Sequence, residues 1–143
     1  MKVLSIIEPW ATLIKDGAKK IETRSFKTNY RGELFIHASK TKIPKYAKEN
    51  SELMSLIKSD FYFGNIICRC SLVDCVYMTH EFIEDLKKNN YQEYICGDYK
   101  VGRYAWILED VQVISPIPAK GKLGIWNYWY FLNMINFLCI ILS

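Results

Sequence analysis

Alternating apolar and polar residues predict four strands in this chain, because successive side chains of a strand point to opposite faces. Residues 31–39, RGELFIHAS, show the alternation most clearly, with Leu34, Ile36 and Ala38 expected on one face. Three further segments are also predicted to be strands: residues 2–7, 64–78 and 104–114. Pro116 and Pro118 are expected to close the last strand, since proline cannot donate a ladder hydrogen bond.

A short helix is predicted directly after the first strand. Pro9 suits a first helical turn, and Gly17 stands where a left-handed C-cap belongs. Between them, Trp10, Leu13 and Ile14 share one apolar face at helical spacing. From about residue 20 the pattern becomes extended.

Two more helices are predicted farther along the chain. Residues 44–59 are helical in period, and Thr79 suits the N-cap of HEFIEDLKK, whose acidic-then-basic order matches the helix dipole. Residues 89–102 are polar and are expected to form an irregular connection. Strands of unequal length mixed with short helices, without a βαβ rhythm, predict an α+β domain around a small barrel.

The segment DGAKKIETRS, residues 16–25, places Gly17, Lys19, Glu22 and Arg24 in the spacing G-x-K-x-x-E-x-R. So many charges rarely collect in a core, so the segment is either a solvated turn or a polar site. If Lys19 stays in the turn while Glu22 enters a strand, both side chains can point to one cleft. Alternatively, Glu22 and Arg24 form an ion pair on a solvated strand, worth under about 1 kcal/mol.

Composition narrows the class without naming a ligand. The chain has 143 residues, half of them apolar, which is enough for one domain with a continuous core. A net charge of +4 is compatible with a polyanionic partner but does not require one. Five cysteines and the lack of a signal-like apolar run before Glu8 predict a reducing compartment, the cytoplasm or, in a eukaryote, the nucleus.

The cysteines raise the question of a zinc site. Cys68, Cys70 and Cys75 lie close in sequence, and a fourth ligand would have to come from Cys96, His80 or His37. There is no paired C-x-x-C motif, and small core packing accounts for two cysteines in one strand. No metal and no other cofactor is therefore expected.

The last part of the chain differs from the rest. Residues 124–143 carry no charged side chain, and a run of this length approaches that of a membrane span. Asn127, Asn133 and Asn136 weaken a membrane interpretation, because each costs free energy in hydrocarbon without a partner. A buried or dimerising tail and a read-through extension remain as alternatives to membrane contact.

Several motifs together resemble one family. The opening LSIIEPW, the G-x-K-x-x-E-x-R element and YRGE before a strand resemble the N-terminal half of an ASCH domain, a branch of the PUA-like superfamily. The later segments GNIICRCSLVDCV, YAWILEDV and KGKLGIWNY fit the same family. The resemblance is strongest to the ASCH domain of a eukaryotic transcriptional coactivator and to small stand-alone microbial proteins. It covers residues 1–128 and leaves residues 129–143 as an apolar tail of unknown role.

The resemblance implies a PUA-like fold, a small mixed β-barrel with flanking short helices and a cleft beside the first helix. The G-x-K-x-x-E-x-R element is expected to line that cleft, and RNA or a nucleotide-like ligand is the expected partner. Glu22 could accept from a base amino group, and Trp10 or Tyr30 could stack on an unpaired base. The expected phosphate contacts are Lys19, Arg24, Arg31 and Lys40.

Three of these candidates also have a structural interpretation. Trp10 is equally suited to anchor its helix in the core, and Arg31 could simply be a turn residue before Gly32. His37 is near enough to Lys40 in sequence to join the cleft, although a lone strand histidine is more often a satisfied polar residue.

An enzyme is the main alternative function. Some small ASCH-like proteins resemble amidohydrolases of acylated cytidines such as N4-acetylcytidine, which use a lysine and a threonine nucleophile. Lys19 matches the lysine, but Glu22 stands at the threonine position and Thr23 lies one place off. A carboxylate is a poor nucleophile for an amide, so a Lys19–Glu22 pair suits binding or proton transfer better. A protein-interaction module that uses the aromatic tail is a third hypothesis.

Overall fold

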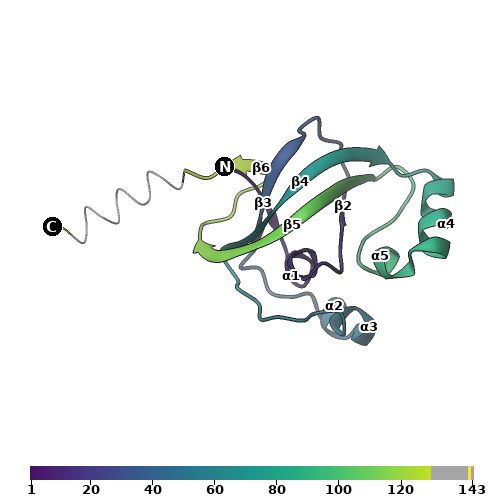
Figure 1. The fold of residues 1–143 in the computed structure, drawn as a ribbon. Helices are drawn as coiled ribbons and strands as arrows, with labels where there is room; N and C mark the ends of the chain where they lie inside the picture. The colour runs from purple at the N-terminus through teal and green to yellow at the C-terminus, as the bar shows by residue number, and fades with distance from the viewer. Residues whose placement is uncertain (130–141, 143) are drawn as a thin grey trace.

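A six-stranded sheet that curls into a half-barrel forms the centre of the molecule (Figure 1). The computed structural model describes residues 1–129 and 142. The strand order is β2-β5-β4-β3-β1-β6, with β1 and β3 parallel and the other neighbours antiparallel. The strands are β1 (Lys2–Ile6), β2 (Ile21–Arg24), β3 (Gly32–Ala38), β4 (Asn65–Tyr77), β5 (Tyr104–Pro118) and β6 (Ile125–Asn127).

Five short helices flank the sheet in the described part of the chain. Helix α1 contacts β1, β3, β4 and β5, and Figure 1 shows α2 and α3 beyond it and α4 with α5 at the β2 side. The helices are α1 (Trp10–Lys15), α2 (Lys45–Lys48), α3 (Ser51–Met54), α4 (His80–Asn89) and α5 (Tyr91–Ile95). The predicted α+β class, with a small mixed sheet and flanking short helices, is confirmed.

The main core lies between α1 and the concave side of the sheet. Leu34, Ile36 and Ala38 are fully buried in it, as the alternation predicted. Their strand neighbours Phe35 and His37 are also buried, because the opposite face of β3 is covered as well. Burial on both faces makes β3 a rigid support for the residues that follow it.

Helix α1 ends as its sequence predicted. Gly17 has φ +86°, a left-handed conformation that glycine adopts without the strain a Cβ brings, and the chain turns there toward β2. Glu8, directly before the helix, is fully buried and accepts hydrogen bonds from the backbone and hydroxyl of Thr12. These hydrogen bonds fix the first turn of α1, so the helix that leads into the turn at Gly17 is held in place.

Two of the helix predictions needed correction. Residues 44–59 form two short helices rather than one, because Asn50 has extended backbone angles and caps α3 by accepting from the Leu53 amide. Residues 89–102 are not wholly irregular, since they contain α5, whose Glu93 accepts a hydrogen bond from the Lys20 amide. The predicted Thr79 N-cap of α4 is confirmed by its bond from the Phe82 amide.

The last long strand continues farther than expected. Strand β5 extends to Pro118, although Pro116 and Pro118 were expected to close it. The partner strand β2 pairs only with residues 104–107 of β5, so the later part of β5 has no strand partner on that edge among the described residues. Proline is tolerated there because its missing N–H can face away from β4.

The predictions for the tail fall almost entirely outside the described residues. Only Trp129 and Leu142 of residues 129–143 belong to them. Within the described part of the chain, no helix is both long and apolar enough to cross a membrane.

Candidate functional site

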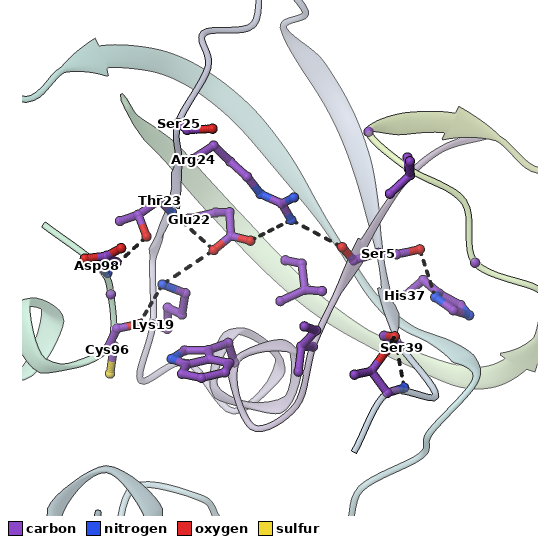
Figure 2. Close-up of a pocket in the computed structure, with 18 of the residues that line it drawn as sticks. Ser5, Lys19, Glu22, Thr23, Arg24, Ser25, His37, Ser39, Cys96 and Asp98 are labelled. Carbon is purple, nitrogen blue, oxygen red and sulfur yellow. Dashed lines mark hydrogen bonds and ion pairs between the residues drawn. The ribbon is translucent and has the colours of Figure 1, made fainter. Parts of the chain in front are cut away.

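A cleft of about 1150 Å³ opens beside α1. Its walls come from the ends of β1 and β3, from β2, from the segment after α5 and from the connection between β5 and β6. Figure 2 shows Arg24 of β2 reaching toward the main-chain carbonyl of Ser5 in β1, whereas the Ser5 hydroxyl points to His37. The cleft therefore joins segments that are far apart in sequence.

The G-x-K-x-x-E-x-R element forms one side of this cleft. Glu22 and Arg24 project from the same face of β2, and Arg24 Nη2 lies 2.9 Å from Glu22 Oε2. Lys19 reaches the same carboxylate from the turn, with Nζ 3.7 Å from Glu22 Oε1. The prediction that these three side chains meet at one cleft is consistent with this geometry.

Lys19 is nevertheless deeply buried, at 1% exposure. Its ammonium donates to the carbonyl of Ile21 at 2.6 Å and to that of Cys96 at 2.8 Å. With Glu22 nearby, each of its three N–H groups has an acceptor within reach. Lys19 therefore ties β2 to the segment after α5 and has little capacity left for a phosphate.

A second buried carboxylate lies behind Lys19. Burial raises the pKa of Glu93, and the neighbouring Lys19 charge lowers it in part. Glu93 Oε1 accepts from the Lys20 amide at 2.6 Å, whereas Oε2 has no hydrogen-bond partner among the described residues. The Lys19 charge therefore acts on two carboxylates, Glu22 in the cleft and the buried Glu93.

Arg24 is the cation of the element that solvent can reach. Its side chain is 23% exposed, and Nη2 also donates to the Ser5 carbonyl at 3.2 Å. The guanidinium carbon lies 5.9 Å from the centre of the Trp106 ring, which limits its movement. Arg24 is thus held in place while part of its fork remains open to the cleft.

His37 and Ser5 form a closed hydrogen-bond chain on the opposite wall. His37 Nε2 lies 2.7 Å from the Ala119 carbonyl, so Nε2 carries the proton. Nδ1 of the same ring lies 3.0 Å from Ser5 Oγ, and Ser5 Oγ accepts from Trp126 Nε1 at 3.0 Å. Since His37 is 1% exposed, it holds neighbouring segments together rather than facing a ligand.

Two exposed aromatic rings line the cleft beside Trp10. Trp10 is half-buried and packs against the core, and Tyr46 lies 6.1 Å from it with 70% exposure. Phe26 is 48% exposed and contacts Trp106 edge to face. Sequence reasoning did not find Tyr46 or Phe26, because only tertiary structure brings the helix α2 and the end of β2 to the cleft. Tyr30, the other predicted stacking residue, instead donates to the Glu33 carbonyl outside it.

Arg31 is the one predicted cation that lies outside the cleft. Its guanidinium donates to the carbonyls of Thr28 and Tyr30 and lies 3.9 Å from an oxygen of Asp74. These contacts fit the turn interpretation of Arg31, which the structure places outside the cleft. Lys40, in contrast, does line the cleft.

Thr23, the residue nearest the hydrolase nucleophile position, also reaches the cleft. Its Oγ1 accepts from the Asp98 amide at 3.1 Å, which links β2 to the segment after α5 (Figure 2). The Lys19 ammonium, which would have to activate this hydroxyl in a hydrolase, instead directs its bonds to two carbonyls. Thr23 in this arrangement connects β2 to the segment after α5 and has a structural role.

Three of the described cysteines, Cys68, Cys70 and Cys96, are buried in the core, and Cys75 is half-buried. Burial raises the pKa of the Cys68 thiol, that of Cys70 to about 12 and that of Cys96 to about 11. In the part of the chain that the structure describes, no three His, Cys, Asp or Glu side chains gather as a metal site would need.

The cleft carries an excess of positive charge. Its lining contains the two carboxylates Glu22 and Asp98. The lining cations outnumber them: Lys19, Arg24, Lys40, Arg103, Lys120 and Lys122. An open, basic cleft with aromatic rings at its wall is suited to an anionic ligand that contains a flat ring.

Comparison with known proteins agrees with this architecture. The chain is 30% identical over 129 residues to Activating signal cointegrator 1 of Mus musculus and 29% identical to the same protein of Homo sapiens. The match covers 87% of this chain but 22% of each relative, so the chain spans about a fifth of their length.

Solved structures show the same fold. The ASCH protein of Zymomonas mobilis superposes with a TM-score of 0.58 at 15% identity, covering 97% of this chain and 94% of that one. A single-substitution mutant of the same protein gives a TM-score of 0.56 at 16% identity, with 97% and 96% coverage. The ASCH domain model matches residues 4–118, from β1 to the end of β5 and including the whole charged element. The chain therefore belongs to the ASCH domain family and has its PUA-like fold.

Proposed function

We propose that this protein binds single-stranded RNA, or a nucleotide-like ligand, in the cleft beside α1. The observation that carries the proposal is the composition of the cleft, in which six cations face two carboxylates within about 1150 Å³. Pockets of several hundred Å³ accommodate ligands of drug size, so this volume is sufficient for a nucleotide.

Glu22 and Arg24 are the proposed centre of the site. Arg24 is held by Glu22 and the Ser5 carbonyl, and its exposed part can contact a phosphate or a base edge. The Glu22 carboxylate has four lone-pair positions, and its contacts come from Thr23 N, Lys19 and Arg24. The remaining position can accept from the amino group of a base such as cytosine.

The aromatic rings are proposed to hold the base. Tyr46 and Phe26 are more exposed than Trp10, so they are better placed to stack on an unpaired base. Trp10 would then act mainly as the packed support of Tyr46, to which it lies close.

An amidohydrolase is less well supported. Lys19 Nζ directs its hydrogens to two carbonyl oxygens and a carboxylate, and this arrangement leaves no lone pair to attack or to accept a proton. The intracellular location stays a prediction, as does the proposed division of the chain at residue 128.

Fluorescence anisotropy with labelled oligo(C) and oligo(U) RNA tests the proposal. Arg24→Gln is expected to weaken binding and to lower the salt slope by about 0.7, the value for one phosphate contact on a single strand. Arg69→Gln is the matched control, because Arg69 is exposed on β4 and contacts Gln112 outside the cleft.

Glu22→Gln separates base recognition from charge alone. If Glu22 accepts from a cytosine amino group, the neutral amide of the variant accepts more weakly than the carboxylate, so the preference for oligo(C) over oligo(U) falls despite the removal of a negative charge. If Glu22 only contributes charge, the same variant binds both RNAs more tightly. Unchanged affinity in Arg24→Gln, with wild-type binding intact, would place the site elsewhere.

A further inference from the structure

Three lysines gather at the end of the sheet where β1, β3 and β5 finish and where β4 and β6 start. Strand β3 ends at Ala38 beside the end of β1, and β4 begins at Asn65 opposite Pro118, the last residue of β5. Strand β6 returns beside β1, with Ile125 opposite Leu4. Residues 119–124 therefore cross this end of the sheet, and they bring Lys120 and Lys122 to the cleft that Lys40 also lines.

These lysines differ from the other cations of the cleft. Lys19 and Arg24 contact Glu22, and Arg103 contacts Asp98. For Lys40, Lys120 and Lys122, no carboxylate of the described residues lies within ion-pair distance, and all three are exposed. The uncompensated charge of the cleft is therefore concentrated at this end.

We propose that residues 119–124 form the phosphate-binding end of the cleft, with Lys40, Lys120 and Lys122 as its cations and with the Ser5–His37 pair as the support that positions them. The inference rests on the proposed function and gives the ligand two parts. A base lies toward Glu22, and the phosphate groups of the same strand or nucleotide lie toward the lysines.

The lysines are attached to fixed backbone rather than to free loops. A Cβ built on Gly64 would lie 2.6 Å from Lys40 Cε, so the Lys40 side chain runs directly over this glycine. The Gly64 amide donates to the Ala38 carbonyl at 2.6 Å, and its carbonyl accepts from the Ala119 amide at 3.0 Å. Gly64 thus connects the Lys40 side chain to the start of the segment that carries the other two lysines.

His37 and Ser5 support the same segment from below. His37 donates to the Ala119 carbonyl, and Ser5 accepts from Trp126 just after the segment, so both of its ends are tied to one buried pair. A Cβ on Gly121 would lie 2.9 Å from both His37 Cε1 and Ser5 Oγ. Any side chain at residue 121 would therefore push the backbone between the two lysines away from the sheet.

The test compares salt slopes of RNA binding. The double variant Lys120→Gln/Lys122→Gln is expected to lower the slope of log K against log salt by about 1.4, two single-strand phosphate contacts. Lys58→Gln/Lys88→Gln, which removes two exposed lysines outside the cleft, is expected to leave the slope close to that of the wild type. An equal loss in both double variants would mean that general charge, and not this segment, binds phosphate.

The positioning role is tested with His37→Ala and Gly121→Ala. Each is expected to lower the slope in the wild-type background and to have no further effect on the slope when Lys120 and Lys122 are already glutamine. Gly121→Ala keeps all side chains of the buried pair, so it tests the support even if His37→Ala does not fold. A slope unchanged in Gly121→Ala overturns the positioning role.

Competition distinguishes the source of the phosphate. A nucleoside monophosphate that displaces labelled RNA, where the free nucleoside does not, identifies a single nucleotide as sufficient ligand. Displacement by an oligonucleotide alone identifies a strand. Absence of RNA binding by the wild-type chain overturns both proposals, whereas wild-type binding with an unchanged slope in the Lys120→Gln/Lys122→Gln variant overturns only this one.

Discussion

Replacement of Lys19 by methionine should destabilise the protein strongly, although it leaves the solvent-exposed surface almost unchanged. Methionine keeps the approximate length of the side chain and removes the ammonium. The carbonyls of Ile21 and Cys96 then lose their charged donor, and Glu22 loses one of its two cations. Lys19 is 1% exposed, so water cannot readily replace these contacts.

The expected cost follows from these contacts. Hydrogen bonds to a charged group contribute about 1.5–3 kcal/mol each, and removal of one member of a buried charge pair typically costs about 3–5 kcal/mol. The ammonium's own desolvation cost disappears with it, so the contributions do not simply add. A loss of about 3–5 kcal/mol is expected, from a total stability of about 5–15 kcal/mol for a typical domain.

Urea unfolding followed by tryptophan fluorescence measures this loss. Lys20→Met is the matched control, because the neighbouring Lys20 side chain is exposed and should change stability by less than about 0.5 kcal/mol. A Lys19→Met variant that unfolds within about 1 kcal/mol of the wild type would refute the reasoning that Lys19 is a structural tie. The result also decides how binding data are interpreted, since lost RNA affinity in a partly unfolded Lys19 variant would say nothing about contact.

Three further predictions concern the core and its edges. Burial raises the pKa of Glu8 above 4.5, so the folded state holds this proton more tightly than the unfolded state and stability falls as pH rises above that value. Glu8→Gln can keep both bonds to Thr12 and does not titrate. In urea unfolding, the variant should therefore gain stability relative to the wild type as pH rises from about 4.5 to 8. Peptide mapping after brief thiol labelling should find Cys75 modified before the three buried cysteines, Cys68, Cys70 and Cys96, because these have raised pKa values and no access; faster labelling of any of them would contradict the fold. Thr79→Ala should cost about 1 kcal/mol in thermal or urea unfolding by removing the cap of the Phe82 amide, and Thr79→Ser should restore most of it.

Local patterns predicted the long strands and the ends of α1 because these depend on side-chain alternation and backbone conformation. The Leu34 face and the left-handed Gly17 are examples. The elements that the patterns missed depend on distant partners. Strand β6 is three residues long and exists through its pairing with β1, and α5 is fixed by a contact between Glu93 and the Lys20 amide.

The candidate site divides in the same way. Spacing placed Glu22 and Arg24 on one face of a strand, which needs only a period of two. It did not reveal that Lys19 is enclosed by the Cys96 carbonyl, a contact between residues 77 positions apart. It also missed Lys120 and Lys122, because no local pattern tells that residues 119–124 cross the sheet beside His37.

The burial of Lys19 and His37 indicates that both side chains have structural roles. Lys19 and His37 look like reactive groups in sequence, yet both are about 1% exposed and each is tied to main-chain carbonyls. Each holds together segments that carry the exposed groups: Lys19 supports β2 with Arg24, and His37 supports the segment with Lys120 and Lys122. A site with fixed donors loses less side-chain freedom when it binds a ligand, so buried polar ties at its base improve affinity without touching the ligand. In such a cleft the buried contacts of Lys19 and His37 would maintain the structure, while the exposed cations would determine which ligand binds.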